Sequence, residues 1–248
     1  MQIALDEQIK LLAKQLKIPT FANYNSVQDN ADPDSTFGEL LLKVMRTEYE
    51  QRQENNNRRR LKQANFPFTK TIDELDLSRY DGQITDLFLN ELASCRFIDE
   101  KKNLVMIGNP GRGKTHMAIG LGLKACASGK TVLFKNAASL STELSEAKDN
   151  YALGKLEKKI QRVDLLIIDE MGYVSFDRFQ SELIFKVIAD RSERGSTIVT
   201  TNLAFSEWTN LFENTAMVAA LVDRLTFRSY LLDMNGDSYR LDHSKHRA

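Results

Sequence analysis

Cysteine and histidine are scarce in this chain, and their scarcity excludes several kinds of site. The 248 residues include two cysteines, Cys95 and Cys126, and three histidines, His116, His243 and His246. They form no Cys-x-x-Cys pair and no Cys/His cluster, which argues against a disulfide framework and against structural zinc. We interpret the cysteines as small buried apolar residues. No metal other than Mg²⁺ is expected.

Long apolar runs and an excess of one charge are also missing. Apolar runs, such as residues 165–168, are far too short to span a bilayer. The N-terminal segment MQIALDEQIK lacks the basic-then-apolar order of a signal peptide. We therefore expect a cytoplasmic protein with no membrane partner. The 34 basic and 34 acidic residues balance, so any contact with nucleic acid must come from a local patch.

A phosphate-binding loop is the strongest positive signal. The stretch GNPGRGKT at residues 108–115 follows the apolar run 103–107 and has the spacing Gly-x4-Gly-Lys-Thr. In such a loop the backbone N–H groups point at phosphate oxygens, Lys114 reaches the β- and γ-phosphates, and the Thr115 hydroxyl is placed to hold Mg²⁺. A helical run follows, so a helix N-terminus would face the phosphates. The predicted nucleotide-binding residues are Gly108, Asn109, Pro110, Gly111, Arg112, Gly113, Lys114, Thr115 and His116.

Apolar strands alternate with helical stretches from residue 71 onward, which is typical of an α/β fold with a parallel sheet. With 42% apolar residues, the chain can bury the core of one large domain with a small appendage. The predicted strands are 103–107, 131–136, 165–169, 196–201 and 229–233. The predicted helices are 84–95, 115–128, 138–161, 177–194 and 216–226. About fifteen residues follow the last strand, so we expect no full C-terminal lid.

The first 65 residues are expected to form a separate helical domain. Apolar residues recur at helical spacing over 5–16, and Pro19 closes that segment. The polar stretch 21–35 is predicted to be a loop, and Ser35 or Thr36 could cap a second helix over 37–62. Pro67 disfavours helix at the residue before it, so the predicted domains are 1–65 and 66–248.

Polar residues end two of the predicted strands and complete a candidate catalytic site. Asp169 and Glu170 follow the strand 165–168, about 55 residues after the P-loop. We expect Asp169 to hold Mg²⁺ and Glu170 to act as the general base toward an attacking water. Asn202 ends the strand 196–201, and parallel strands open on one crevice at their carboxyl ends. Its amide could therefore bridge the γ-phosphate and the water.

Several arginines and one lysine have weaker signals. Arg224 follows an apolar helix and could reach the γ-phosphate of a neighbouring subunit as an arginine finger, or simply pair with Asp223. Arg240 is a candidate for nucleotide or inter-subunit contact, with a plain surface charge as the alternative. The cluster Arg58, Arg59, Arg60 and Lys62 could contact DNA phosphates, or could be a solvated helix end. The single tryptophan, Trp208, is interpreted as a packing residue.

These motifs together resemble the IstB-like ATP-binding proteins. The matching segments are GNPGRGKTHMAIGLG (108–122), the run from IIDEMGY to NLAFSEW (167–208), AALVDRLTFRSYLLDMNGDSYR (219–240) and the linker 48–78. The family belongs to the AAA+ class and is related to the DnaA initiator and the DnaC helicase loader. The resemblance implies Walker A roles for Lys114 and Thr115, Walker B roles for Asp169 and Glu170, sensor 1 at Asn202 and a finger at Arg224.

The resemblance also implies partners and a process. It implies ATP hydrolysis with Mg²⁺, self-assembly into an oligomer on double-stranded DNA, location at the bacterial nucleoid when on DNA, and recruitment and stimulation of an IstA-type transposase. It places the adenine pocket near Phe68 to Leu77, where the chain has LDLS in place of a more aromatic linker motif. A DnaC-like helicase loader is the main alternative, and an ATP-binding scaffold without turnover is another. A GTPase is disfavoured because no Asn-Lys-x-Asp motif is present.

Overall fold

The computed structural model describes residues 2–80, 84–212 and 214–236, with side chains from residue 5 onward. Contacts between residues divide the chain into two compact units, Met1–Arg59 and Arg60–Ala248. In the described part of the chain, no helix has both the length and the apolar composition required to cross a membrane.

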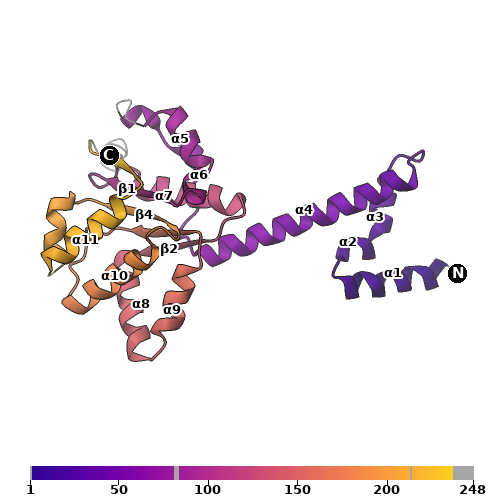
Figure 1. Cartoon of the computed structure of the whole chain (residues 1–248). Helices are drawn as coiled ribbons and strands as arrows, with labels where there is room; N and C mark the ends of the chain where they lie inside the picture. Colours follow the sequence, from indigo (N-terminus) through magenta and orange to yellow (C-terminus); the bar gives the residue numbers. More distant parts are fainter. Residues whose placement is uncertain (1, 81–83, 213, 237–248) are drawn as a thin grey trace, which may run out of the picture. The chain divides into compact units, whose positions relative to one another are not determined.

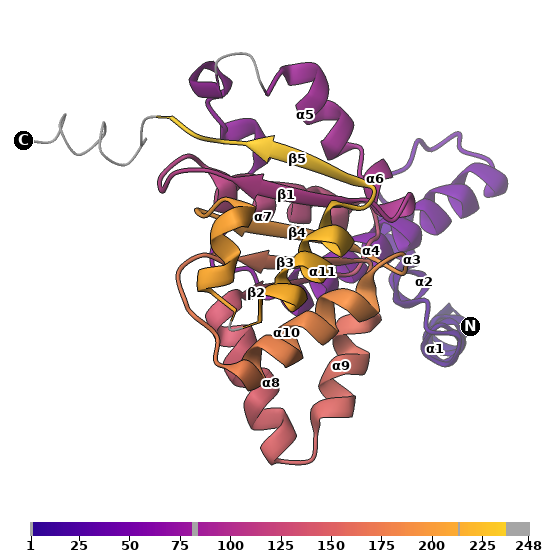
Figure 2. The same cartoon turned by 60° about the vertical axis from the view of Figure 1, so that its left-hand side comes forward.

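A parallel sheet of five strands forms the centre of the second unit (Figures 1 and 2). Its order is β2-β3-β4-β1-β5, and every neighbouring pair is parallel. The predicted α/β class with a parallel sheet is therefore confirmed. The strands are β1 (Asn103–Ile107), β2 (Val132–Asn136), β3 (Leu165–Asp169), β4 (Ser196–Thr201) and β5 (Ser229–Asp233).

Strand β2 starts one residue later than predicted, because Thr131 forms hydrogen bonds with Asp164 before the strand begins. The backbone N–H and the hydroxyl of Thr131 both donate to the Asp164 carboxylate at 2.8 Å. These two bonds join the segments that enter β2 and β3.

Helices cover both faces of the sheet, and the alternation of side chains along each strand feeds two apolar cores. In β3, Leu165 and Ile167 belong to one core, while Leu166 and Ile168 belong to the other. The first core packs under α5 (Asp86–Ala93), α6 (Arg96–Asp99) and α7 (Lys114–Ala127). The second core packs under α8 (Ala137–Asp149), α9 (Leu153–Gln161), α10 (Arg178–Arg191) and α11 (Thr215–Thr226). Short 3₁₀ helices lie at η1 (Ile72–Glu74), η2 (Leu77–Tyr80) and η3 (Phe205–Asn210).

A residue in the left-handed region interrupts one predicted helix, and another such residue follows the end of a second. The single helix expected over 138–161 is wrong, because Tyr151 has a φ of +56° and separates α8 from α9. Cys95, with a φ of +60°, likewise separates α5 from α6. A helix cannot continue through a left-handed residue. Both cysteines are free and buried, and Trp208 is fully buried, as expected of packing residues.

The first unit is helical, and the predicted loop 21–35 is wrong in its first half but correct from residue 29 onward. It contains α1 (Gln2–Leu16), α2 (Pro19–Ala22), α3 (Tyr24–Gln28) and the start of α4 (Phe37–Ala64), so two short helices occupy most of the stretch 19–28. Pro19 starts α2 rather than only ending α1, because its fixed φ suits the first helical turn. The buried Glu48 carboxylate accepts a hydrogen bond from the Thr20 N–H at 3.0 Å, which ties α2 to α4.

Arg191 is a buried cation that joins three segments of the second unit. Its side chain is 1% exposed. The guanidinium donates to the carbonyl oxygens of Ile160 at 2.7 Å, Val163 at 3.1 Å and Ser196 at 2.7 Å. Burial lowers the pKa of Arg191 to about 10. The ends of α9 and α10 and the starts of β3 and β4 thus meet at one side chain.

Replacing Arg191 with methionine is expected to destabilise the protein by about 3 kcal/mol, because the buried carbonyls lose their donor. Chemical denaturation of the full chain measures the change. The matched control is Arg194→Met, at an exposed position three residues on, which should change stability by less than about 0.5 kcal/mol. Equal effects of the two substitutions would show that Arg191 contributes no more than a surface arginine.

Candidate active site

The P-loop connects the carboxyl end of β1 to the first residue of α7. Gly111 and Gly113 both have a φ of +81°, a conformation that is costly for residues with a side chain. Gly113 is the N-cap of α7, so the free N–H groups of that helix point into the loop. Lys114 is buried, and its ammonium donates to the carbonyl oxygens of Gly108 at 2.6 Å and Asn109 at 2.8 Å. The loop therefore has the curled form that binds phosphates through backbone N–H groups.

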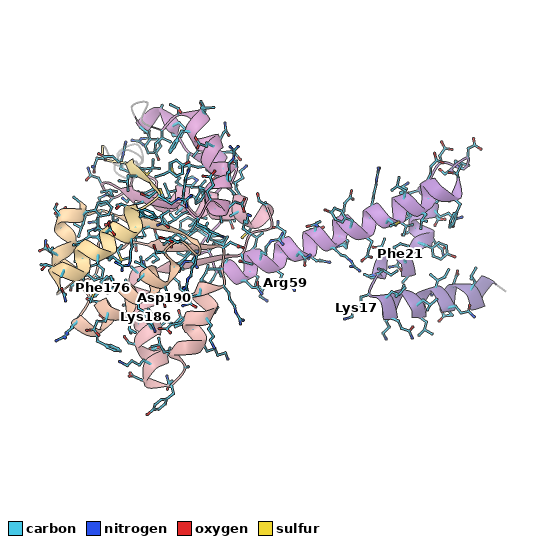
Figure 3. All side chains as sticks on the ribbon, viewed as in Figure 1. Lys17, Phe21, Arg59, Phe176, Lys186 and Asp190 are labelled. Atoms are coloured by element: carbon cyan, nitrogen blue, oxygen red, sulfur yellow. The ribbon has the colours of Figure 1, made fainter. Side chains whose placement is uncertain are left out.

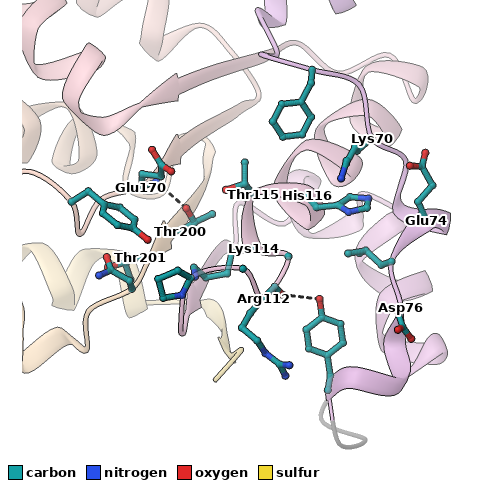
Figure 4. A pocket seen from close by; sticks show the side chains of 18 residues that line it. Lys70, Glu74, Asp76, Arg112, Lys114, Thr115, His116, Glu170, Thr200 and Thr201 are labelled. Atoms are coloured by element: carbon teal, nitrogen blue, oxygen red, sulfur yellow. Dashed lines mark hydrogen bonds between the residues drawn. The ribbon is translucent and has the colours of Figure 1, made fainter. Parts of the chain in front are cut away.

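A pocket of about 470 Å³ opens above this loop (Figure 4). Its floor is formed by residues 110–116, and its walls come from the segment 68–80 on one side and from Glu170, Tyr173 and residues 200–202 on the other. The sheet brings these parts together, because the carboxyl ends of β1, β3 and β4 are neighbours. The volume and the mixed polar lining suit a ligand the size of a nucleotide.

Asp169 and Thr115 form the part of the site that fits a magnesium ion. The Thr115 hydroxyl donates to the Asp169 carboxylate at 2.9 and 3.1 Å, and the Thr200 hydroxyl donates to it at 2.5 Å. Burial is the main cause that raises the pKa of Asp169, against the lowering effect of these hydroxyls. One carboxylate and one hydroxyl beside a phosphate site are the donors that Mg²⁺ uses together with phosphate oxygens. The residues present therefore fit this ion.

Glu170 is held in place by two contacts that the sequence did not reveal. Its backbone is left-handed, with a φ of +60°, and its N–H donates to the Thr200 hydroxyl at 2.9 Å. Its carboxylate accepts a hydrogen bond from the Asn136 amide at 2.6 Å. Asn136 ends β2 and pairs in register with Asp169. A polar residue at the end of the neighbouring strand was the available signal, but the strand order needed to use it is a tertiary property.

Asn202 lies in the wall of the pocket beside Glu170 and the end of β4. Its side-chain oxygen is buried and has no hydrogen-bond partner among the described residues. Buried polar atoms without a protein partner are rare, so the Asn202 oxygen is suited to accept a hydrogen bond from a bound ligand or water. Gly172 leaves the room for this side chain, since a Cβ at Gly172 would lie 2.0 Å from the Asn202 oxygen.

Replacing Gly172 with alanine is expected to displace the Asn202 amide and to lower ATP hydrolysis at least tenfold, while ATP binding is kept. We base the size on the roughly 10²-fold cost of misplacing a group by about 1 Å. Steady-state phosphate release and fluorescent-nucleotide binding measure the two quantities. The control is Gly154→Ala, where a Cβ meets nothing within 4 Å. Unchanged hydrolysis in the Gly172 variant would mean that the position of Asn202 is unimportant.

Arg112 and His116 hold the loop against the segment 68–80. The Arg112 guanidinium packs 5.3 Å from the centre of the Tyr80 ring and donates to the carbonyl oxygens of Met234 and Arg79. The Tyr80 hydroxyl donates to the Arg112 carbonyl at 2.9 Å. His116 Nε2 lies 2.7 Å from the Thr71 carbonyl. These contacts fix one wall of the pocket.

The segment expected to hold the adenine contributes only in part to that wall. Phe68 and Leu75 line the pocket. Leu77, at the end of the expected range, packs against the apolar core instead.

Arg224 lies outside this pocket, near the opposite end of β1. It belongs to α11, donates to the Ala220 carbonyl at 3.0 Å and lies 5.2 Å from the centre of the Phe185 ring. Its carbonyl accepts from the Asn103 amide at 3.4 Å, and Asn103 starts the strand that leads to the P-loop. The structure therefore brings Lys114, Thr115, Asp169, Glu170 and Asn202 together but keeps Arg224 apart. Arg240 is outside the described residues.

The predicted basic cluster is divided between different environments. Arg58 is exposed and pairs with Glu54 at 2.9 Å, and Arg59 and Lys62 are exposed. The Arg60 side chain donates to the Cys126 carbonyl at the end of α7, at 2.8 Å. Arg60 is therefore engaged in packing within the second unit.

Comparison with known proteins places this site in a family. The family model described as IstB-like ATP binding protein matches residues 11–247. An ATP-binding protein of insertion sequence IS21 from Pseudomonas aeruginosa is 32% identical over 94% of this chain and 89% of its own length. An ATP-binding protein of insertion sequence IS5376 from Geobacillus stearothermophilus is 33% identical over 96% of this chain and 95% of its own length.

Solved structures share the fold of most of this chain. The DnaC helicase loader has a TM-score of 0.55 at 22% identity, over 68% of this chain and 96% of that chain. AMPPCP-bound DnaA from Aquifex aeolicus has a TM-score of 0.58 at 15% identity, over 74% of this chain and 55% of that chain. At this level of identity the likeness shows a shared AAA+ fold.

Proposed function

Since this chain belongs to the family of IstB-like ATP-binding proteins, we propose that it is an ATPase that assembles on duplex DNA and regulates transposition by preparing target DNA and recruiting a partner transposase. The observation that carries the ATPase part is the convergence of the P-loop, the Asp169–Thr115 pair, Glu170 and the unpartnered Asn202 oxygen around one pocket. The transposition part rests on relatives that are named as proteins of insertion sequences.

The residues divide the work of hydrolysis as follows. The P-loop N–H groups and Lys114 bind the phosphates, and Thr115 with Asp169 holds Mg²⁺, which when bound neutralises charge on the phosphate oxygens. Glu170 orients the attacking water and accepts its proton, while a bond forms from the water oxygen to the γ-phosphorus and the bond to the ADP oxygen breaks. The Asn202 amide steadies the water or the γ-phosphate.

Two features of the site suggest that hydrolysis depends on assembly. The Asn136 amide donates to Glu170 Oε2 at 2.6 Å, so the orientation of the base depends on the end of β2, and we propose that assembly changes this contact. Arg224 is near the amino end of β1, whereas the pocket is at the carboxyl end. An arginine in that position does not line its own pocket, so the finger role that we propose for Arg224 requires the pocket of another subunit in a homo-oligomer.

A helicase loader is the second candidate, because the DnaC loader aligns with this chain over 96% of its own length. That alignment covers 68% of this chain, whereas the insertion-sequence relatives match 94% and 96% of it. The first unit therefore has its counterparts among the insertion-sequence proteins. This difference favours the transposition role.

Sedimentation of the purified chain, with and without a long random-sequence duplex, tests the proposal. We expect large complexes that require both duplex and either ATP or a slowly hydrolysed analogue, and not ADP. A chain that hydrolyses ATP but forms no complex on duplex under any nucleotide would instead support the loader. An added IstA-type transposase should then co-sediment only with the ATP-bound assembly.

A further inference from the structure

Helix α9 carries a row of cations that the proposed nucleotide site does not use. Lys155, Lys158, Lys159 and Arg162 are all exposed, and we call them the basic face of α9. At 100° per residue these four positions fall within an arc of about 100°. None of them forms an ion pair with the part of the chain that the structure describes. Their charges are thus available to a partner.

The rest of the helix is occupied by packing, which fixes the direction of this face. Leu156 and Ile160 are buried in the second core. Glu157, the one acidic residue of α9, pairs with Lys186 of α10 at 2.7 Å. Gln161 donates to Asp190 of α10 at 3.1 Å, and Figure 3 labels both α10 residues. These contacts hold α9 in one orientation, with its four cations exposed.

Acidic side chains lie beyond both ends of the basic face of α9. They limit the surface of the α8–α9 hairpin that an anionic partner can contact to α9 itself. Glu146 and Asp149 lie at the end of α8, near the hairpin tip, and are exposed. Asp164, beyond the other end, already accepts from Thr131. Figures 1 and 2 both show the hairpin extending beyond the β2 edge of the sheet, so its outer surface is open to a large partner.

We infer that the basic face of α9 binds the phosphate backbone of duplex DNA, an inference that rests on the proposed function and gives it a contact surface. From Lys155 to Arg162 the helix rises about 10 Å. One DNA strand carries a phosphate about every 3.4 Å along the axis, so the face spans about three phosphates. Four cations with no acid on the same face of the helix match this line of charge, because Glu157 points to α10 and pairs with Lys186. Because phosphate contacts carry no sequence information, the contact is independent of base sequence.

The test measures how the affinity of the full chain for a random-sequence duplex changes with salt concentration. A slowly hydrolysed ATP analogue is present throughout. The variant K155Q/K158Q/K159Q removes three phosphate contacts and is expected to reduce the slope of log K against log salt by about 2.7. At 0.1 M salt its affinity should fall at least tenfold. The matched control R96Q/R178Q/R194Q removes three exposed charges elsewhere on the second unit and should keep the parental slope.

The possible results separate this inference from the proposed function. A parent chain that does not bind duplex overturns both. A parent that binds duplex, with equal slopes in the α9 and control variants, overturns only the contact surface. Retained nucleotide binding and an unchanged melting temperature show that the α9 variant is folded, and the single substitution Lys159→Gln, with an expected slope change of about 0.9, repeats the test with less perturbation. A variant that loses binding to phosphatidylserine vesicles but not to duplex would also overturn the inference.

Discussion

Replacing Glu170 with glutamine is expected to lower the rate of ATP hydrolysis by a factor on the order of 10² to 10⁴, which is the usual contribution of a positioned general base. Glutamine keeps the size and the hydrogen-bonding shape of the side chain but cannot take a proton. Nucleotide binding and ATP-dependent assembly on duplex should remain, because the P-loop, Asp169 and Thr115 are unchanged. Phosphate release and sedimentation, measured on the same preparation, separate the two effects.

The control for this variant is Glu182→Gln, which changes an exposed acid on α10 that pairs with Arg178 at 3.4 Å. It should hydrolyse ATP at the parental rate. If the Glu170 variant turned over ATP as fast as the parent, the base would have to be another group. If the parent itself hydrolysed nothing while assembling on duplex, the chain would be a nucleotide-gated scaffold.

Replacing Lys114 with alanine is expected to weaken ATP binding by a factor on the order of 10² to 10³, the range found when one member of a buried charged contact is removed. The lysine is buried at the start of α7, where its ammonium lies between the loop carbonyls and the pocket. Assembly on duplex should be lost with nucleotide binding. Fluorescent-nucleotide titration gives the affinity, and sedimentation reports the assembly.

Lys124→Ala is the matched control, since Lys124 lies on the same helix and pairs with Asp73 at 3.6 Å, outside the pocket. It should bind ATP as the parent does. Assembly of the Lys114 variant at parental levels would show that DNA binding does not depend on the nucleotide, and would remove the gating step from the proposed function.

The parts of the fold and of the site that could be predicted from the sequence are those that depend on local motifs. Four of the five strands have the predicted bounds. Of these, β1, β3 and β4 are buried on both faces in the middle of the sheet, whereas β5 lies at the edge of the sheet and is partly exposed. The P-loop and the pair Asp169–Glu170 were readable because their chemistry depends on neighbours along the chain. The residues at which one helix ends and the next begins were harder to predict from the sequence. The turn residues Asp149 and Asn150 precede the break between α8 and α9, but the left-handed residue itself is Tyr151, a type that rarely adopts this conformation.

Long-range pairing decided the rest. The sequence by itself determined the α/β class and the candidate residues for phosphate and metal, because these follow from periodicity and from the spacing of the P-loop motif. Only the tertiary structure showed that the Asn136 amide reaches Glu170, that Gly172 makes room for Asn202, and that Arg224 lies away from its own pocket. The physical reason is the strand order. Which strand ends become neighbours, and which helix ends lie at the opposite edge, depends on how β2, β3, β4 and β1 pair, and no local stretch of the chain encodes that order.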